Sequence, residues 1–131
     1  WHVNAARLVA FLGLCPTRYR WAVEFRDAEW LCPEVLDVLR RHGAALCIHD
    51  LIADHPAEVT ADWVYLRFHG ANQPEACYTD AALWKAARFI RRRLVEGLDV
   101  AAYFNNDVAG HAVANALRLR EYVRRARGRA E

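Results

Sequence analysis

Four short runs of this chain end in side chains that can carry out chemistry. Residues 65–70 are Tyr-Leu-Arg-Phe-His-Gly, and residues 104–107 are Phe-Asn-Asn-Asp. Two shorter runs end similarly, in Glu-Phe-Arg at residues 24–26 and in Ile-His-Asp at residues 48–50. Because parallel strands present their carboxyl ends at one rim of a sheet, this pattern predicts a single polar site to which all four runs contribute.

Two arginines and two proton-transferring side chains occupy matching positions in these runs. Since strand side chains alternate, Arg67 and His69 share one face of their run, and Glu24 and Arg26 share one face of theirs. Guanidinium groups hold carboxylate or phosphate through paired hydrogen bonds. We therefore predict that Arg26 and Arg67 bind the substrate and that Glu24 and His69 are the catalytic acid and base.

The end of the last strand adds amides to the same rim. We predict that Asn105, Asn106 and Asp107 bind substrate, because they precede a helix whose first backbone N–H groups favour anions. Two alternatives stay open. In the first, the charged residues form a purely structural layer, in which Glu24 pairs with an arginine. In the second, Asp107 caps the last helix and does not bind substrate.

We assign no metal and no cofactor to the chain. Carboxylate and imidazole groups at strand ends suit several divalent metals, but their spacing here matches no metal motif. The four cysteines are irregularly spaced and include no Cys-x-x-Cys pair. This spacing predicts free thiols instead of a zinc or redox site.

Hydrophobic periodicity and turn residues divide the chain into alternating helices and strands. Helices are predicted over residues 4–13, 33–42 and 80–97, and from residue 110 towards the end of the chain. Strands are predicted over residues 21–26, 44–49, 63–69 and 99–104. Residues 50–62 are expected to connect two strands without a full helix, and Asp80 is the expected cap of its helix.

This alternation predicts an α/β fold with a parallel four-stranded sheet. At 131 residues the chain has the size of a single domain, residues 1–131. Right-handed crossovers between strands that follow one another in sequence place the helices on one face. A TIM-type (β/α)8 barrel needs about 250 residues, so the predicted elements correspond to half of one.

The charge pattern gives little support for a nucleic-acid or membrane partner. The net charge is only +2, and no apolar run approaches the roughly 18 residues of a membrane-spanning helix. The arginines concentrated in the tail are Arg118, Arg120, Arg124, Arg125, Arg127 and Arg129. A solvated helix face is the favoured interpretation of this tail. The absence of an export signal predicts a cytoplasmic location.

Several of these segments also resemble one protein family. They are Glu24-Phe25-Arg26 with Trp30, Arg41-His42-Gly43, His49-Asp50, residues 65–70, Phe104-Asn105-Asn106-Asp107, Gly110-His111-Ala112 and Asn115-Ala116. Over nearly its whole length the chain is similar to the YecE-like family, the domain-of-unknown-function family seventy-two. The resemblance implies a TIM-barrel-like fold, of which this chain would be the carboxy-terminal half, and no established activity.

These observations predict a site for a small anionic or polyhydroxyl ligand at the carboxyl ends of the strands. If the protein is an enzyme, the site residues indicate acid–base chemistry. The alternative is a non-catalytic scaffold that binds a ligand, or that contacts nucleic acid through the arginine-rich tail. A half-barrel exposes two strand edges, so the isolated chain is expected to self-associate.

Overall fold

A computed structural model describes residues 2–126 as alternating helices and strands. The helices are α1 (Ala5–Gly13), α2 (Pro33–His42), α3 (Asp80–Val95) and α4 (His111–Arg125). The strands are β1 (Ala22–Val23), β2 (Ala45–His49), β3 (Trp63–Phe68) and β4 (Asp99–Phe104). Short 3-10 turns are η1 (Ala28–Trp30), η2 (Pro74–Ala76) and η3 (Val108–Gly110). The predicted alternation is confirmed, including the helix-free connection between β2 and β3.

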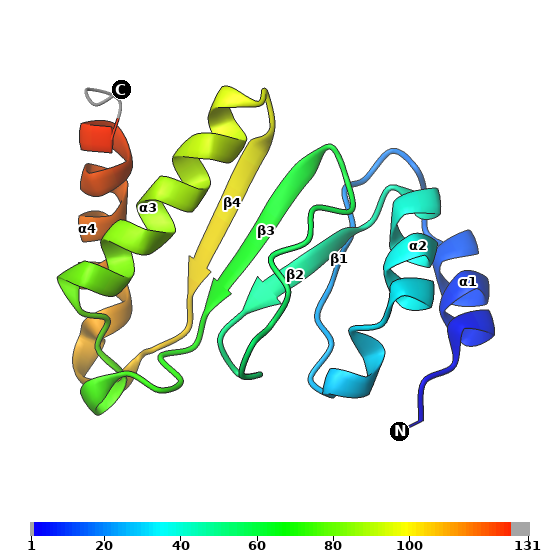
Figure 1. The fold of residues 1–131 in the computed structure, drawn as a ribbon, viewed down its shortest axis with the longest axis horizontal. Coiled ribbons are helices and arrows are strands. Elements are labelled where there is room, and N and C mark those ends of the chain that lie inside the picture. Colours follow the sequence, from blue (N-terminus) through cyan, green and yellow to red (C-terminus); the bar gives the residue numbers. More distant parts are fainter. Residues whose placement is uncertain (1, 127–131) are drawn as a thin grey trace.

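The strands form one parallel sheet in the order β1-β2-β3-β4 (Figure 1). The longest pairing joins β3 to β4, from Trp63 opposite Asp99 to Phe68 opposite Phe104. β1 is the shortest strand and makes only two pairs with β2. The sequential order of the strands confirms the predicted topology, in which the first and last strands are the two edges of the sheet.

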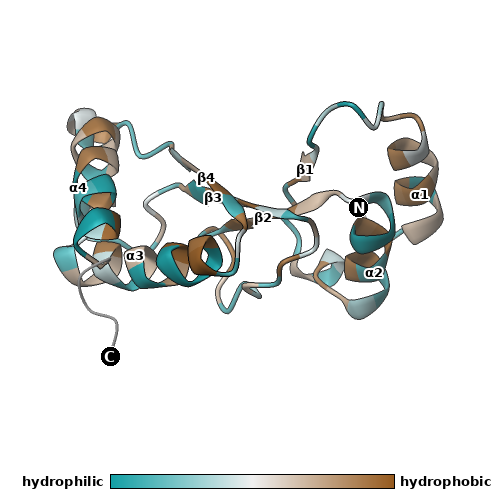
Figure 2. Cartoon of the chain, turned by 90° about the horizontal axis from the view of Figure 1, so that it is seen from above, coloured by the Kyte–Doolittle hydropathy of each residue, from teal (hydrophilic) through white to brown (hydrophobic). Residues whose placement is uncertain are grey.

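The helices pack on one face of the sheet, where alternate strand side chains form two apolar clusters. Leu46 of β2 belongs to the cluster under α1 and α2, and Leu66 of β3 belongs to the cluster under α3 and α4. Seen from above, α1 and α2 lie at one end of the molecule and α3 and α4 at the other (Figure 2). The helix layer is divided because the connection from β2 to β3 contributes no helix to cover the middle of the sheet.

Residues at the helix ends determine where α2 and α3 begin and where α2 ends. α2 begins with Pro33 in its first turn and ends at Gly43, whose φ of 62° is the left-handed conformation that glycine adopts without strain. α3 is capped by Thr79, whose side chain accepts a hydrogen bond from the Ala82 N–H. The prediction that Asp80 caps this helix is therefore wrong by one residue. Asp80 is instead the first helical residue, where a negative charge favours the helix dipole.

The first strand is shorter than the predicted residues 21–26. Only Ala22 and Val23 pair with β2, although the alternation of side chains continues through Arg26. The physical reason is that the Phe25 carbonyl accepts a hydrogen bond from the ring of His49 at 2.8 Å. A side chain thus takes the place of a backbone partner in the sheet.

Three other predictions concern membrane-spanning helices, the arginine-rich tail and the state of the cysteine thiols. None of the helices within residues 2–126 is long and apolar enough to cross a membrane. Two of the tail arginines, Arg127 and Arg129, lie outside the described residues. All four cysteines are free thiols, as predicted.

Hydrogen bonds of Thr60 hold the helix-free connection between β2 and β3 against β2. Its buried hydroxyl accepts a hydrogen bond from the Leu46 N–H at 2.8 Å and donates one to the Ala44 carbonyl at 2.7 Å. One side chain therefore satisfies two backbone groups in the interior. This pair of bonds holds the end of the long connection against the strand that carries His49.

Replacing Thr60 by valine should lower the free energy of unfolding by about 1–3 kcal/mol, because valine keeps the shape but leaves two buried backbone groups without the hydroxyl. Urea denaturation followed by circular dichroism measures the change. The matched control is Thr17→Val at an exposed position, where we expect a change within about 0.5 kcal/mol. Equal losses in both variants would contradict the role of the Thr60 hydroxyl.

Candidate functional site

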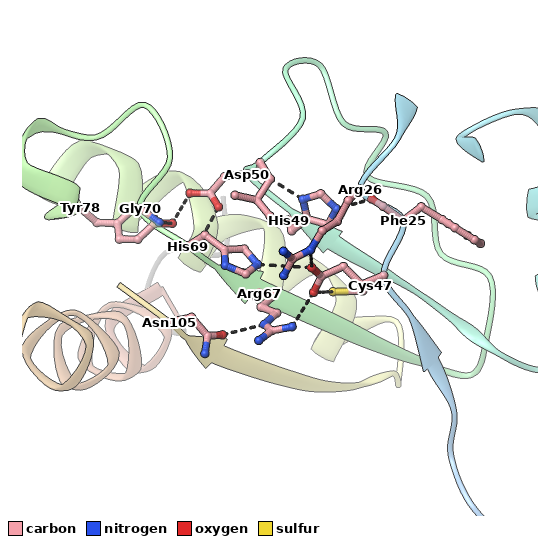
Figure 3. A network of polar contacts seen from close by, with 12 residues as sticks. Phe25, Arg26, Cys47, His49, Asp50, Arg67, His69, Gly70, Tyr78 and Asn105 are labelled. Carbon is pink, nitrogen blue, oxygen red and sulfur yellow. Dashed lines mark hydrogen bonds and ion pairs between the residues drawn. The ribbon is translucent and has the colours of Figure 1, made fainter. Parts of the chain in front are cut away.

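The carboxylate of Glu24 lies at the centre of a polar cluster on the sheet face opposite the helices (Figure 3). Arg26 Nε donates to Glu24 Oε1 at 2.8 Å, and Arg67 Nη1 donates to Glu24 Oε2 at 2.7 Å. His69 Nε2 lies 3.7 Å from Glu24 Oε1. The structure therefore brings together the two side chains predicted to be catalytic and the two arginines predicted to bind substrate.

Strand alternation and sheet order place these side chains. Phe25 packs into the core under α1 and α2, so its neighbours Glu24 and Arg26 point to the opposite face. Leu66 packs into the core under α3 and α4, which sends Arg67 to that same opposite face. β2 lies between β1 and β3, so the ion pair between Glu24 and Arg67 spans the middle of the sheet.

Arg67 is held at two points and still reaches solvent. Besides its bond to Glu24, its Nε donates to Asn105 Oδ1 at 2.7 Å. The side chains of Arg67 and Arg26 are 33% and 67% exposed, whereas that of Glu24 is 15% exposed. One carboxylate between two guanidinium groups leaves a net positive charge, and the positive groups are the accessible ones.

The two arginines determine the ionisation of Glu24. Burial by itself raises the pKa of this carboxyl, but hydrogen bonds from Arg67 and Arg26 and their positive charge lower the pKa to about 2. Glu24 is therefore ionised at neutral pH. In that state it can accept a proton, but it has none to donate.

His69 is the titratable side chain beside this ion pair. Burial lowers the pKa of His69, and the negative charge of Glu24 offsets that effect only in part. The imidazole is therefore neutral at physiological pH. Its Nε2 is buried and makes no hydrogen bond with the described residues, so it faces the cluster as an unsatisfied polar atom.

A second network positions His69; its Asp50 belongs to a predicted strand end, but its Tyr78 was not predicted. Asp50 Oδ1 accepts a hydrogen bond from the backbone N–H of His69 at 2.9 Å, and Asp50 Oδ2 accepts one from the Tyr78 hydroxyl. The same hydroxyl accepts a bond from the Gly70 N–H at 2.8 Å. Tyr78 lies in no periodic pattern of the sequence, so no local signal could have linked it to the strand end.

Gly70 allows the chain to turn tightly after His69. Its φ is +78°, and an added Cβ would lie 2.7 Å from the Ala76 carbonyl oxygen and 3.0 Å from the Asn106 Cβ. A larger residue would therefore meet both conformational strain and backbone contact. The glycine therefore allows the loop after β3 to lie against Ala76 and Asn106.

The three residues predicted to follow β4 into the site separate in the structure. Asn105 is exposed and contacts Arg67 in the cluster. Asn106 is buried and donates to the Ala76 carbonyl and to Asn115 Oδ1, both at 2.8 Å, so it ties loops together away from Glu24. Asp107 is exposed and makes no side-chain capping bond, although it precedes η3.

Two other polar residues near the cluster have fixed, non-reactive states. His49 Nδ1 accepts the Leu51 N–H at 3.1 Å, so its proton is on Nε2, which donates to the Phe25 carbonyl. Burial and the charge of Glu24 raise the pKa of the Cys47 thiol to about 12. Neither side chain offers a proton acceptor or a nucleophile at neutral pH.

The described part of the chain contains no group of three or more His, Cys, Asp or Glu side chains placed to hold a metal ion. The two carboxylates nearest the cluster, Glu24 and Asp50, already bind other groups of the protein. Glu24 binds two arginines, and Asp50 binds Tyr78 and the backbone of His69. Both carboxylates therefore already have partners within the described residues.

Replacing Tyr78 by phenylalanine should destabilise the fold by about 1–3 kcal/mol, because the buried Gly70 N–H and the Asp50 carboxylate both lose a partner. The matched control is Tyr19→Phe, since Tyr19 is 57% exposed. Thermal and urea unfolding compare the two variants. A Tyr78→Phe protein as stable as the control would show that the second network contributes nothing to the loop.

The unfolding free energy should fall as the pH drops from 4.5 towards 2. The folded pKa of Glu24, about 2, lies below its ordinary value of 4.5. The stabilisation is therefore complete above pH 4.5 and is lost on acidification through that window. Glu24→Gln should be less stable at neutral pH, and its difference from the native chain should shrink across the same window. A difference that does not change with pH would contradict the ion pairs.

The sequence matches the family model described as "Protein of unknown function DUF72" over residues 2–131. A solved DUF72 family protein from Enterococcus faecalis is 23% identical, with a TM-score of 0.75 over 92% of this chain and 53% of that chain. Another, from Thermotoga maritima, is 25% identical, with a TM-score of 0.69 over 92% of this chain and 52% of that chain. No curated protein matches the sequence.

The chain thus spans about half the length of the two solved structures, and its parallel sheet and helices reproduce half of their fold. The family model covers almost every residue, including all the strand ends that form the polar cluster. The resemblance inferred from those strand ends is confirmed, and the chain belongs to the DUF72 family.

Proposed function

We propose that the cluster around Glu24 binds a small anionic or polyhydroxyl ligand. The observation that carries this proposal is the pair of guanidinium groups held by one partly buried carboxylate. Glu24 neutralises only one of the two positive charges and keeps both groups at one place on the sheet. Preorganised arginines recognise carboxylate or phosphate with little further ordering.

Asn105 and His69 extend the binding surface on both sides of Arg67. The amide of Asn105 fixes one edge of the guanidinium group and is itself exposed to a ligand. His69 presents a neutral Nε2 without a hydrogen bond to the described residues. Because this nitrogen is buried, a ligand hydroxyl would satisfy it only after a neighbouring side chain moved, and such a contact would suit a ligand that carries both negative charge and hydroxyl groups.

If the site is catalytic, His69 is the group suited to accept a proton. Its burial keeps it neutral, and Glu24 beside it would stabilise the protonated form. Glu24, which we predicted as a catalytic residue, would then act as an ionised partner of the arginines and of the imidazolium. Asn106 and Asp107, which we predicted as ligand-binding residues, have no contact with this cluster that supports such a role.

The barrel interpretation supports a site at this position. We propose that the sheet is the carboxy-terminal half of a TIM-type barrel, whose strand carboxyl ends form the functional rim. All cluster residues lie at or just beyond those ends. The alternative nucleic-acid role has less support, because Arg118 pairs with Asp80 and Arg125 pairs with Glu121, which reduces the free positive charge of the tail.

Binding of inorganic phosphate and of citrate to the 131-residue chain, measured by titration calorimetry, tests the proposal. Arg67→Lys should weaken binding by about 1.5–3 kcal/mol, because an ammonium group cannot replace the planar guanidinium fork. The matched control is Arg88→Lys, at an exposed position of α3, which should leave the affinity unchanged. Equal affinities for all three proteins would remove Arg67 from the site.

A further inference from the structure

The imidazole of His69 lies beside the carboxylate of Glu24 without being bonded to it. Its Nε2 is 3.7 Å from Glu24 Oε1, which is within the range of an ion pair but beyond that of a hydrogen bond. The two side chains are only 13% and 15% exposed. Within residues 2–126, this nitrogen is buried and has no hydrogen-bond partner. A proton on the imidazole would therefore supply an ion pair that the neutral ring lacks.

Charged groups face His69 from each of the first three strands. Glu24 and Arg26 follow β1. Asp50 follows β2, and Arg67 lies in β3. Figure 3 draws the last three in one network with His69. Burial lowers the pKa of His69, the two carboxylates raise it, and the two guanidinium groups lower it. The protonation of His69 therefore depends on a balance between two negative and two positive neighbours.

Two neighbouring histidines are less suited to take up a proton in response to this balance. The ring of His49 lies 6.1 Å from that of His69, and the ring of His55 lies 4.4 Å from that of His49. Both nitrogens of His49 are in use, so a second proton would break its bond from the Leu51 N–H. Burial lowers the pKa of His55, whose Nδ1 bonds a backbone carbonyl. His69 is therefore the imidazole placed to respond to the cluster.

An anion bound to the two arginines would change the charge that His69 experiences. With His69 neutral, Arg26 and Arg67 outweigh Glu24 by one positive charge. A bound anion cancels that charge and competes with Glu24 for the same guanidinium donors. The partly buried carboxylate then has less positive charge beside it, and a proton on His69 restores what it has lost.

We propose that the Glu24 cluster binds its anion together with a proton, which His69 takes up from solvent. This inference rests on the proposed function, because it concerns the regulation of binding at that same site. The proton adds to the lone pair of the imidazole, and no other covalent bond forms or breaks. The imidazolium ion pairs with Glu24, so His69 acts through the carboxylate and need not touch the anion.

Thermodynamic linkage gives the direction of the resulting pH dependence. If anion binding favours the protonated imidazole, protonation of the imidazole must favour anion binding by the same factor. Glu24 stays ionised throughout, because its pKa is about 2. Anion affinity should therefore be lowest at about pH 8, where His69 is neutral in both states, and should rise on acidification towards about pH 5.

Titration calorimetry of the 131-residue chain with sulfate tests the inference, because sulfate keeps the same charge across this pH range. Measurements near neutral pH in two buffers of different ionisation enthalpy give the number of protons taken up. We expect uptake of a fraction of a proton for each sulfate bound. The affinity should be at least about fivefold higher at about pH 5 than at about pH 8.

Two variants separate His69 from a general effect of charge. His69→Gln should bind sulfate without proton uptake and with the same affinity at both pH values, because glutamine stays neutral. The matched control is His42→Gln, at an exposed position at the end of α2, which should behave like the native chain. Circular dichroism verifies that both variants are folded. An NMR titration of the native chain needs no variant, and its midpoint for His69 should move to higher pH when sulfate is present.

The outcomes distinguish a failure of this inference from a failure of the proposed function. Sulfate binding without proton uptake, or a His69 midpoint that sulfate does not move, would overturn the inference and leave the anion site in place. Proton uptake that persists in His69→Gln would also overturn it, because another group would then carry the proton. Absence of sulfate binding at every pH would contradict the anion site itself and would overturn both.

Discussion

The arrangement of the polar face depends on the ionised carboxylate of Glu24. A partly buried carboxylate is costly unless cations and hydrogen-bond donors surround it, and here Arg26 and Arg67 supply both. Because Arg67 comes from β3 and Glu24 follows β1, this single requirement joins two strands across β2. The same ion pairs position two guanidinium groups at the rim and keep His69 beside a negative charge.

The loops around this cluster are held by a different kind of interaction. The Tyr78 hydroxyl donates to the Asp50 carboxyl group, and together these two side chains accept hydrogen bonds from the backbone N–H groups of His69 and Gly70. Burial and the bond to Asp50 raise the pKa of Tyr78, so its hydroxyl keeps its proton and remains a donor. The charged cluster is thus supported by a separate hydrogen-bond network, in which Asp50 and Tyr78 fix the loop that carries His69.

The described residues cover only one face of the sheet. Two helix pairs cover one face, while the other face and both sheet edges are uncovered within residues 2–126. A packed parallel sheet normally has both faces covered. Exposed apolar side chains such as Tyr103 and Val113 lie near the β4 edge.

The sequence by itself determined the parallel α/β topology and most element boundaries, because hydrophobic periodicity, glycines and prolines act locally. β4, for example, begins and ends where predicted. It also indicated that Glu24, Arg67 and His69 share one face. Only the tertiary structure decided the short β1, the separation of Asn105 from Asn106 and the role of Tyr78. These depend on contacts between residues far apart in the chain, such as His49 with Phe25, which no local pattern encodes.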